Sequence, residues 1–148
     1  MGRNYSIDGR DTNTAATTIL GLTSAATIRP KIGYLSIGSY GTPNDYGAEY
    51  QLGRYTVAGT STAVTPQALD PANPASLASA GEAHSVEPTY TANAIMLSIG
   101  VHMRDNFQWY AAPDKEITLP PTAANGIGLY VVAVSTAWTA CAVMHFEE

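Results

Sequence analysis

The stretch NGIGLYVVAV, residues 125–134, decides which fold class the chain can adopt. It opens with Asn-Gly, a dipeptide that strongly favours the tight turn of a β-hairpin. Apolar residues then occupy both faces of the strand that follows: Ile127, Leu129 and Val131 on one face, and Tyr130, Val132 and Val134 on the other. A strand of this kind is typical of a parallel sheet covered by helices. Because the chain shows almost no helical pattern, something other than helices must shield the second apolar face of this strand from solvent.

Other segments alternate apolar and polar residues in the way that half-buried strands do. The clearest is NAIMLSIGVHM, residues 93–103, in which every second residue from Ile95 to Met103 is apolar. Further strand patterns, separated by turn residues, occur at 31–38, 48–58, 105–111, 116–119 and 138–146. Residues 15–29 fit either a helix or two short strands split at Gly21, and their threonines and isoleucines favour the strands. About eight strands without a sustained helical period predict an all-β protein. Eight antiparallel strands in two sheets form a jelly-roll sandwich, and we expect that fold.

Two segments lack a strand pattern. Residues 1–14 are polar and rich in turn formers, so we expect an N-terminal arm that is frayed or ordered only by a partner. Residues 15–148 then form a single jelly-roll domain, whose length is ordinary for one domain. Within it, residues from about 59 to 90 are dominated by Gly, Thr, Ser, Ala and Pro. We interpret this segment as one long loop, a feature that is usually functional or disordered.

The composition excludes some partners. The formal net charge is −5 and the arginines are scattered, which argues against nucleic acids and anionic membranes as partners. Charged residues make up 13% of the chain, whereas about 25% is ordinary. A surface with so little charge is less costly to bury against another protein. The same composition is equally typical of a β-protein that places Thr and Ser at the exposed positions of its strands and binds no partner there.

The sequence offers no metal site and no cofactor motif. His84, His102 and His145 stand singly, without the close histidine pair that metal-binding jelly rolls use. Cys141 is the one cysteine, which excludes a disulfide within the chain and suggests a small buried apolar residue. We therefore predict that the protein holds neither a metal nor a cofactor.

Catalytic residues are equally hard to assign, and we predict that the protein is not an enzyme. Asp105 with Glu116 or Glu87 would supply the two carboxylates of a glycosidase, but the sequence does not place them together. The aromatic residues allow a platform on which sugars stack, although a place in the core or at a subunit contact is the favoured interpretation. These residues are Trp109, Tyr110, Tyr130 and Trp138.

Several longer segments carry a resemblance to a known family. They are TSAATIRPKIGYLSIGS (23–39), RYTVAGTSTAVTPQALDPANPAS (54–76), FQWYAAPDKEITLPPTAANGIGLYVV (107–132) and the acidic end HFEE (145–148). In these segments, and over roughly residues 15–148, the chain resembles the small jelly-roll decoration (cement) proteins of tailed bacteriophage heads. That group is related in form to tumour-necrosis-factor-like trimers. The shared pattern consists of small residues, turns and strand apolarity and includes no catalytic signature.

The resemblance implies a structural virion protein that is made in the host cytoplasm and sits on the outer capsid surface. It implies a homotrimer at threefold and local threefold positions, which clamps copies of the major capsid protein and stabilises the head. The arm residues expected to contact the capsid are Arg3, Tyr5, Ile7 and Arg10. The residues expected at the trimer interface are Trp109, Tyr130, Val132, Val134 and Trp138. Either face of strand 127–134 can meet the neighbouring subunit on this interpretation.

An alternative function belongs to a different class. A jelly-roll module of a phage tail or fibre would recognise glycans on the host surface, using Trp109 or Trp138 as the stacking residue. Glycan binding that is lost when the tryptophan is replaced distinguishes this module from a capsid protein.

Overall fold

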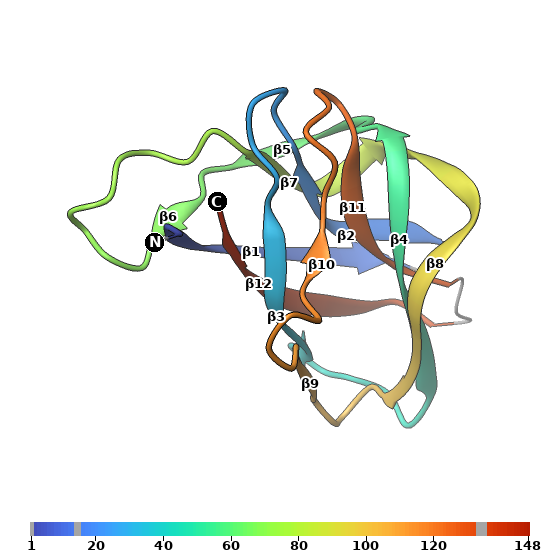
Figure 1. Cartoon of the computed structure of the whole chain (residues 1–148). Coiled ribbons are helices and arrows are strands. Elements are labelled where there is room, and N and C mark those ends of the chain that lie inside the picture. Colours follow the sequence, from blue (N-terminus) through green and yellow to red (C-terminus); the bar gives the residue numbers. More distant parts are fainter. Residues whose placement is uncertain (1, 14–15, 133–135) are drawn as a thin grey trace.

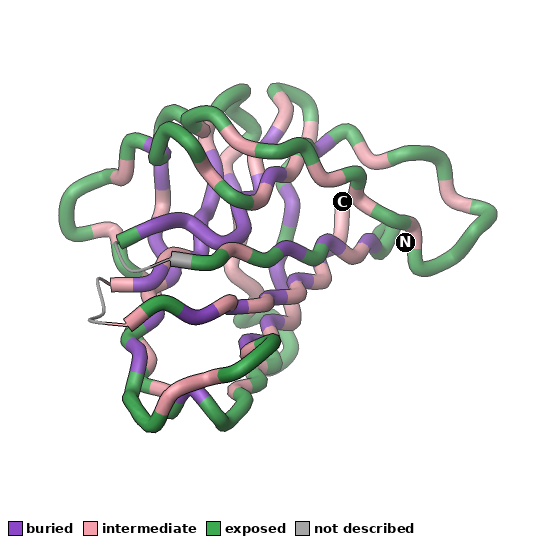
Figure 2. Tube along the Cα trace, turned by 180° about the vertical axis from the view of Figure 1, so that it is seen from behind, coloured by how far each residue is buried: buried purple, intermediate pink, exposed green. Residues whose placement is uncertain are grey.

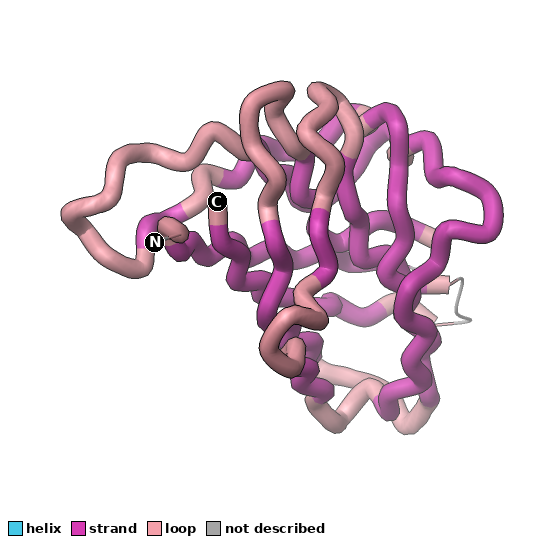
Figure 3. Tube along the Cα trace, in the orientation of Figure 1, coloured by secondary structure: helices cyan, strands magenta, loops and turns pink. Residues whose placement is uncertain are grey.

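The chain folds as a β-sandwich. The computed structural model describes residues 2–13, 16–132 and 136–148, and within these ranges it contains twelve strands and no helix. The strands form two antiparallel sheets that pack face to face (Figure 1, Figure 3). The predictions of an all-β protein and of a two-sheet sandwich are confirmed, while the number of strands is twelve instead of about eight.

Each sheet has six strands. In sheet A the order is β10-β3-β12-β1-β6, and β9 pairs with β3 on the same side as β10. Its strands are β1 (Asn4–Asn13), β3 (Lys31–Tyr40), β6 (Gln67–Ala68), β9 (Phe107–Tyr110), β10 (Ile117–Thr118) and β12 (Trp138–Glu147). In sheet B the order is β5-β7-β2-β11-β4-β8. Its strands are β2 (Thr17–Thr23), β4 (Gly47–Val57), β5 (Thr60–Val64), β7 (Ser79–Val86), β8 (Thr89–His102) and β11 (Gly126–Val131).

The core lies between the two sheets and follows the alternation of the strands. Strand β12 alternates strictly between buried and half-buried residues, from buried Trp138 to buried Phe146. Strand β11 contributes Ile127, Leu129 and Val131, all of which are fully buried. Figure 2 shows how buried residues line the interior while the loops are exposed. The open question about strand 127–134 is therefore answered for one face: this set of three fills the sandwich.

The predicted N-terminal arm is wrong, because residues 4–13 form strand β1 inside sheet A. Strand β1 pairs with β12 along its whole length, from Asn4 opposite Glu147 to Asn13 opposite Trp138. Tyr5 and Ile7 point into the core and are 0% and 1% exposed. The alternation of the sequence does not predict this strand, because Gly9 takes the third inward position and only two apolar side chains mark the inner face.

The predicted long loop is also wrong in its extent. Strands β5, β6 and β7 lie within residues 59–90, and the longest part of this segment without a strand is 69–78. This shorter loop projects from the sandwich, at the left of Figure 1. The loop is held at its middle by the Tyr5 hydroxyl, which donates to the Pro74 carbonyl at 3.0 Å, and at its end by the Ala78 N–H, which donates to the Glu148 carboxylate at 2.9 Å. Small residues hid these strands, because Thr, Ser and Gly pair through their backbone without producing an apolar period.

If β1 belongs to the sheet, then truncating its inward side chains must destabilise the fold. We expect Ile7→Ala to lower the free energy of unfolding by about 2–5 kcal/mol, because it removes methyl groups from a closed core. Asp8 is exposed on the same strand, so Asp8→Ala should change it by no more than about 0.5 kcal/mol. Urea denaturation measures both values. If both substitutions change the free energy of unfolding by the same small amount, residues 4–13 are an arm and not a strand of the sheet.

Candidate functional site

The second face of β11 is covered by tyrosines from the same sheet. Tyr55 on β4 lies across Gly126, where an added Cβ would stand 2.3 Å from the Tyr55 Cζ atom. Tyr90 on β8 reaches across Gly53 and Gly128, and a Cβ on Gly128 would stand 2.2 Å from the Tyr90 hydroxyl. An aromatic ring laid over glycines on a neighbouring strand is a known way to pin the register of a sheet. Neither helices nor a second subunit are needed to cover this face.

Both tyrosine hydroxyls form hydrogen bonds with threonines of β2. Tyr55 Oη lies 2.7 Å from Thr23 Oγ1, and Tyr90 Oη lies 2.7 Å from Thr18 Oγ1. The Glu87 carboxylate accepts the Thr18 N–H at 2.9 Å and also its hydroxyl proton. A polar network whose members are paired in this way rigidifies a fold and offers no free group to a ligand. We therefore assign the outer face of sheet B around β11 a structural role.

Burial changes the acidity of these tyrosines. Desolvation raises the pKa of Tyr55 to about 12, against a smaller lowering by its hydrogen bond to Thr23. Desolvation likewise raises the pKa of Tyr90, and the hydrogen bond to Thr18 opposes it. Tyr130 completes the tyrosine cluster (Tyr55, Tyr90 and Tyr130), with its ring centroid 4.9 Å from that of Tyr90. All three rings stay protonated at neutral pH.

The residues predicted for the trimer interface do not share a surface. Trp138 is 3% exposed and belongs to the core, so it cannot contact a sister subunit. Trp109 is half-buried on β9 in sheet A, and Tyr130 lies in the tyrosine cluster on sheet B. Val132 is half-buried beyond the end of β11, and its N–H donates to the Glu49 carbonyl at 2.9 Å. Val134 lies outside the described residues.

The residues predicted to contact the capsid are divided in the same way. Tyr5 and Ile7 are core residues and are closed to any partner. Arg3 and Arg10 are exposed. The Arg10 guanidinium lies 5.9 Å from the centre of the Tyr40 ring, within the range of a cation–π contact. Only the two arginines remain available to a partner.

The histidines serve separate local purposes. His84 Nδ1 lies 3.0 Å from the Thr18 carbonyl oxygen, and His102 Nδ1 accepts the Arg104 N–H at 3.2 Å. His145 lies on β12 and stacks against Tyr34. Among the described residues, no group of three or more His, Cys, Asp or Glu side chains could hold a metal ion.

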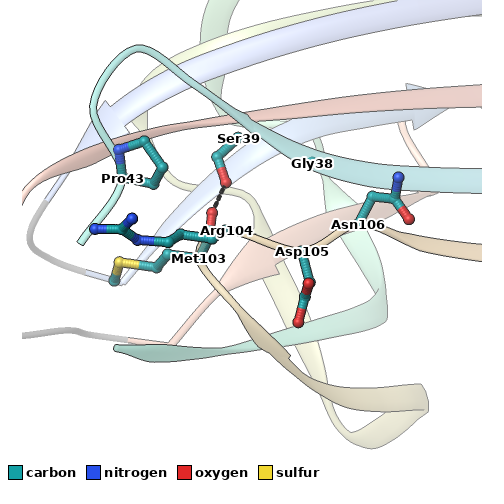
Figure 4. A pocket seen from close by; sticks show the side chains of 7 residues that line it. All are labelled: Gly38, Ser39, Pro43, Met103, Arg104, Asp105 and Asn106. Carbon is teal, nitrogen blue, oxygen red and sulfur yellow. Dashed lines mark hydrogen bonds between the residues drawn. The ribbon is translucent and has the colours of Figure 1, made fainter. Parts of the chain in front are cut away.

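The carboxylates considered for a glycosidase are not gathered in one pocket. Asp105 lines an open cavity of about 530 Å³ beside the turn that follows β8, while Glu116 lines a different one and Glu87 binds Thr18. In Figure 4 the side chains of Arg104 and Asp105 point in different directions, and the Ser39 hydroxyl donates to the Met103 carbonyl. The cavity is lined by Gly38, Ser39, Pro43, Met103, Arg104, Asp105 and Asn106. This set contains no pair of carboxylates and no nucleophile beside a base.

The outer face of sheet A carries aromatic and polar side chains in one line. The register places Tyr110 opposite Tyr34, Tyr34 opposite His145, His145 opposite Ser6, and Ser6 opposite Gln67. We call these five residues the transverse row, because they cross β9, β3, β12, β1 and β6 in turn. The Tyr34 ring centroid lies 4.7 Å from that of Tyr110 and 4.8 Å from that of His145. Of the row, only Tyr110 was among the aromatic residues singled out from the sequence.

A shallow pocket of about 140 Å³ adjoins the transverse row at His145. It lies where the 111–116 segment leaves the edge of β3, since β9 and β10 pair with β3 on either side of Gly33. Burial lowers the pKa of His145, so its imidazole is neutral at neutral pH. The pocket is lined by Asn4, Lys31, Gly33, Glu116, His145, Phe146 and Glu147.

Comparison of the chain with protein-family models, with curated proteins and with solved structures gives no match. Within the described residues there is also no helix with the length and apolar character needed to cross a membrane.

The tyrosine packing predicts which glycines resist substitution. Gly128→Ala should lower the free energy of unfolding by about 1–3 kcal/mol, because its new methyl group collides with the Tyr90 hydroxyl. Gly38 on the outer face of sheet A has nothing within 4 Å of an added Cβ, so Gly38→Ala should be tolerated. Adding Tyr90→Phe to Gly128→Ala removes the nearest clashing atom and should recover part of the loss. Urea denaturation of the four proteins tests this, and a Gly128→Ala variant as stable as Gly38→Ala contradicts it.

The buried tyrosines also predict a loss of stability in alkali. The unfolded chain ionises Tyr55 near pH 10, whereas the folded chain holds its proton up to about pH 12. Unfolding therefore releases a proton in this window, and the free energy of unfolding falls as the pH rises through it. The Tyr55 share of that loss is on the order of 2 kcal/mol. Urea denaturation from pH 9 to about pH 12, compared with Tyr55→Phe, measures it; identical slopes for both proteins would exclude this origin.

Proposed function

We propose that the protein is a decoration (cement) protein, a jelly-roll homotrimer on the outside of a tailed-phage head. It occupies threefold and local threefold positions, binds the major capsid protein and stabilises the shell. The resemblance of residues 15–148 to such proteins supports this proposal, and so does the two-sheet sandwich of the fold. The structural observation that carries it is the exposed, uncharged edge strand of sheet B.

That edge is strand β8, which is 14 residues long and within the described residues pairs only with β4. An edge strand offers unpaired N–H and C=O groups, and natural proteins protect long edges with charges, prolines or bulges. Strand β8 has no charged residue and no proline from Thr89 to Val101. Its pairing with β4 shifts register three times before Leu97, around Asn93 with its φ of 57°, and is regular from Leu97 to His102. A long neutral edge of this kind indicates a surface that another protein covers.

The side chains of β8 support the same conclusion. Leu97, Ile99 and Val101 face inward but remain half-exposed at the border of the core, and Ile95 is 48% exposed. A partner laid along this edge would bury them, and each fully buried apolar side chain stabilises a contact by about 1.5–3 kcal/mol. We therefore place the trimer contact at β8, in place of Trp138 and Tyr130. A threefold assembly needs two different surfaces per contact, of which β8 supplies one.

The loop 69–78 is the better candidate for capsid contact, now that the arm is a strand. It projects from the sandwich and carries two exposed leucines, Leu69 at 53% and Leu77 at 60% exposure. Hydrogen bonds from Tyr5 and to Glu148 fix it in place, so little conformational entropy is lost on binding. Three such loops on one rigid trimer bind a shell far more tightly than one loop does.

The edge of β8 gives a direct test of assembly. Light scattering should show the wild-type protein at three times the 15.5 kDa of one chain. Ile95→Lys should give a folded monomer, because a lysine on the edge opposes strand pairing. Val86→Lys is the matched control: Val86 is an apolar strand residue of sheet B with 57% exposure, but it pairs with Thr60 of β5 and is not on the free edge of β8, so this variant should stay trimeric.

The same proteins test the capsid role. Expanded heads that lack the protein should bind the wild type and Val86→Lys, and they should bind Ile95→Lys much more weakly because the monomer loses avidity. A wild-type protein that is monomeric at micromolar concentration contradicts the trimer. An Ile95→Lys variant that stays trimeric shows that the subunit contact does not lie at β8. Failure to bind heads, together with absence from purified virions, overturns the proposed function.

A further inference from the structure

The transverse row on the outer face of sheet A has exposed residues at its two ends, Tyr110 and Gln67, and half-buried residues between them. Tyr110 is 67% exposed at one end of the row, and its ring lies against Tyr34, which in turn lies against His145. The pairing of the five strands fixes the order of the side chains. Because neighbouring strands are about 4.8 Å apart, the row crosses about 19 Å of the sheet. Tyr34 lies between the rings of Tyr110 and His145, so a ligand along the row packs on the exposed Tyr110 ring and then meets the side chains of His145, Ser6 and Gln67.

The adjoining pocket adds hydrogen-bonding groups without closing the surface. Gly33 forms part of its lining, and nothing lies within 4 Å of the position that a Cβ would take there. Lys31 and Glu116 line the same pocket, and the one salt bridge among the described residues joins Arg104 to Asp45 instead. The ammonium and carboxylate groups therefore remain available to a ligand.

We propose that the transverse row and this pocket bind a neutral oligosaccharide laid across sheet A. The faces of sugar rings are rich in C–H groups, which carry a slight positive charge and pack on the negative face of an aromatic ring. Sugar hydroxyls both donate and accept hydrogen bonds, so they require donors such as Lys31 and acceptors such as Glu116 side by side. The pocket itself is small and lined mainly by polar groups, so the aromatic surface for a sugar ring is that of Tyr110 in the adjoining row.

Charge selects among the sugars. Glu116 and Glu147 line the pocket against a single lysine, and the whole chain carries a net charge of −5. A polyanionic glycan would be repelled by these groups, whereas an uncharged one loses nothing. The tryptophans that suggested sugar binding from the sequence play no part here, because Trp138 is buried and Trp109 is absent from the row. The inference does not rest on the capsid role, since the row lies on sheet A and the proposed subunit contact lies at the edge of sheet B.

The test uses the full chain and uncharged probes. An array of neutral glycans that includes malto-, cello- and chito-oligosaccharides should give binding, and calorimetry then measures the affinity for the strongest one. Tyr110→Ala should weaken that affinity about tenfold, since it removes an aromatic face, and Glu116→Gln should also weaken it. Tyr40→Ala is the matched control, because Tyr40 is 64% exposed at the end of β3 on the same face but lies outside the row. Its affinity should stay within about twofold of the wild type, a difference well below one hydrogen bond.

Three outcomes overturn the site. They are the absence of any neutral glycan bound by the wild type, binding confined to charged glycans, and equal losses in Tyr110→Ala and Tyr40→Ala. Thermal unfolding checks that each variant is folded, and if Tyr110→Ala is not, Glu116→Gln against Tyr40→Ala decides alone. Binding of Tyr110→Ala to expanded heads separates this site from the capsid role, because the proposed head contacts lie elsewhere on the molecule.

Discussion

The structure depends on the burial of β11 on both faces. One face places Ile127, Leu129 and Val131 in the sandwich, where each is fully buried. The other face has glycines at 126 and 128, and the rings of Tyr55 and Tyr90 lie in the space those glycines leave. Because each ring spans β11 and ends on a threonine of β2, the tyrosines bind β2, β11 and β4 to one another beyond the backbone ladder. Register and burial are thus fixed by the same contacts.

This arrangement marks the limit of what the sequence could predict about the fold. Alternation located β11 and β12, since their inward residues are all apolar. It failed for β1, where Gly9 stands at an inward position. It also failed for β5 to β7, whose small residues pair through their backbone without an apolar alternation. The tyrosine cover could not be predicted at all. Tyr90 reaches Gly128 only because β4 lies between β8 and β11, and strand order is not a local property of sequence.

The same reasoning explains which functional residues were missed. Trp138 was expected at the trimer interface, but its position in the strict alternation of β12 turns it inward. His145 lies on the opposite face of that strand, and the pairing of β12 with β3 brings it beside Tyr34. The outward direction of His145 and Tyr34 could be inferred from the alternation within each strand. Their adjacency could not, because it depends on a register between strands far apart in the chain.

The molecule leaves two kinds of surface uncovered, and they differ in what they can bind. The edge of β8 offers backbone groups and half-exposed aliphatic side chains, which suit a second polypeptide strand or an apolar protein surface. The outer face of sheet A has its backbone groups paired within the sheet and presents rings, hydroxyls and single charges, which suit a small polar ligand. Assembly through the first leaves the second free, because an edge contact extends a sheet in its own plane while the outer face of the other sheet stays in solvent. A trimer joined at β8 would therefore present three copies of the transverse row, and weak binding of one sugar chain at each would become strong attachment to a surface that carries many.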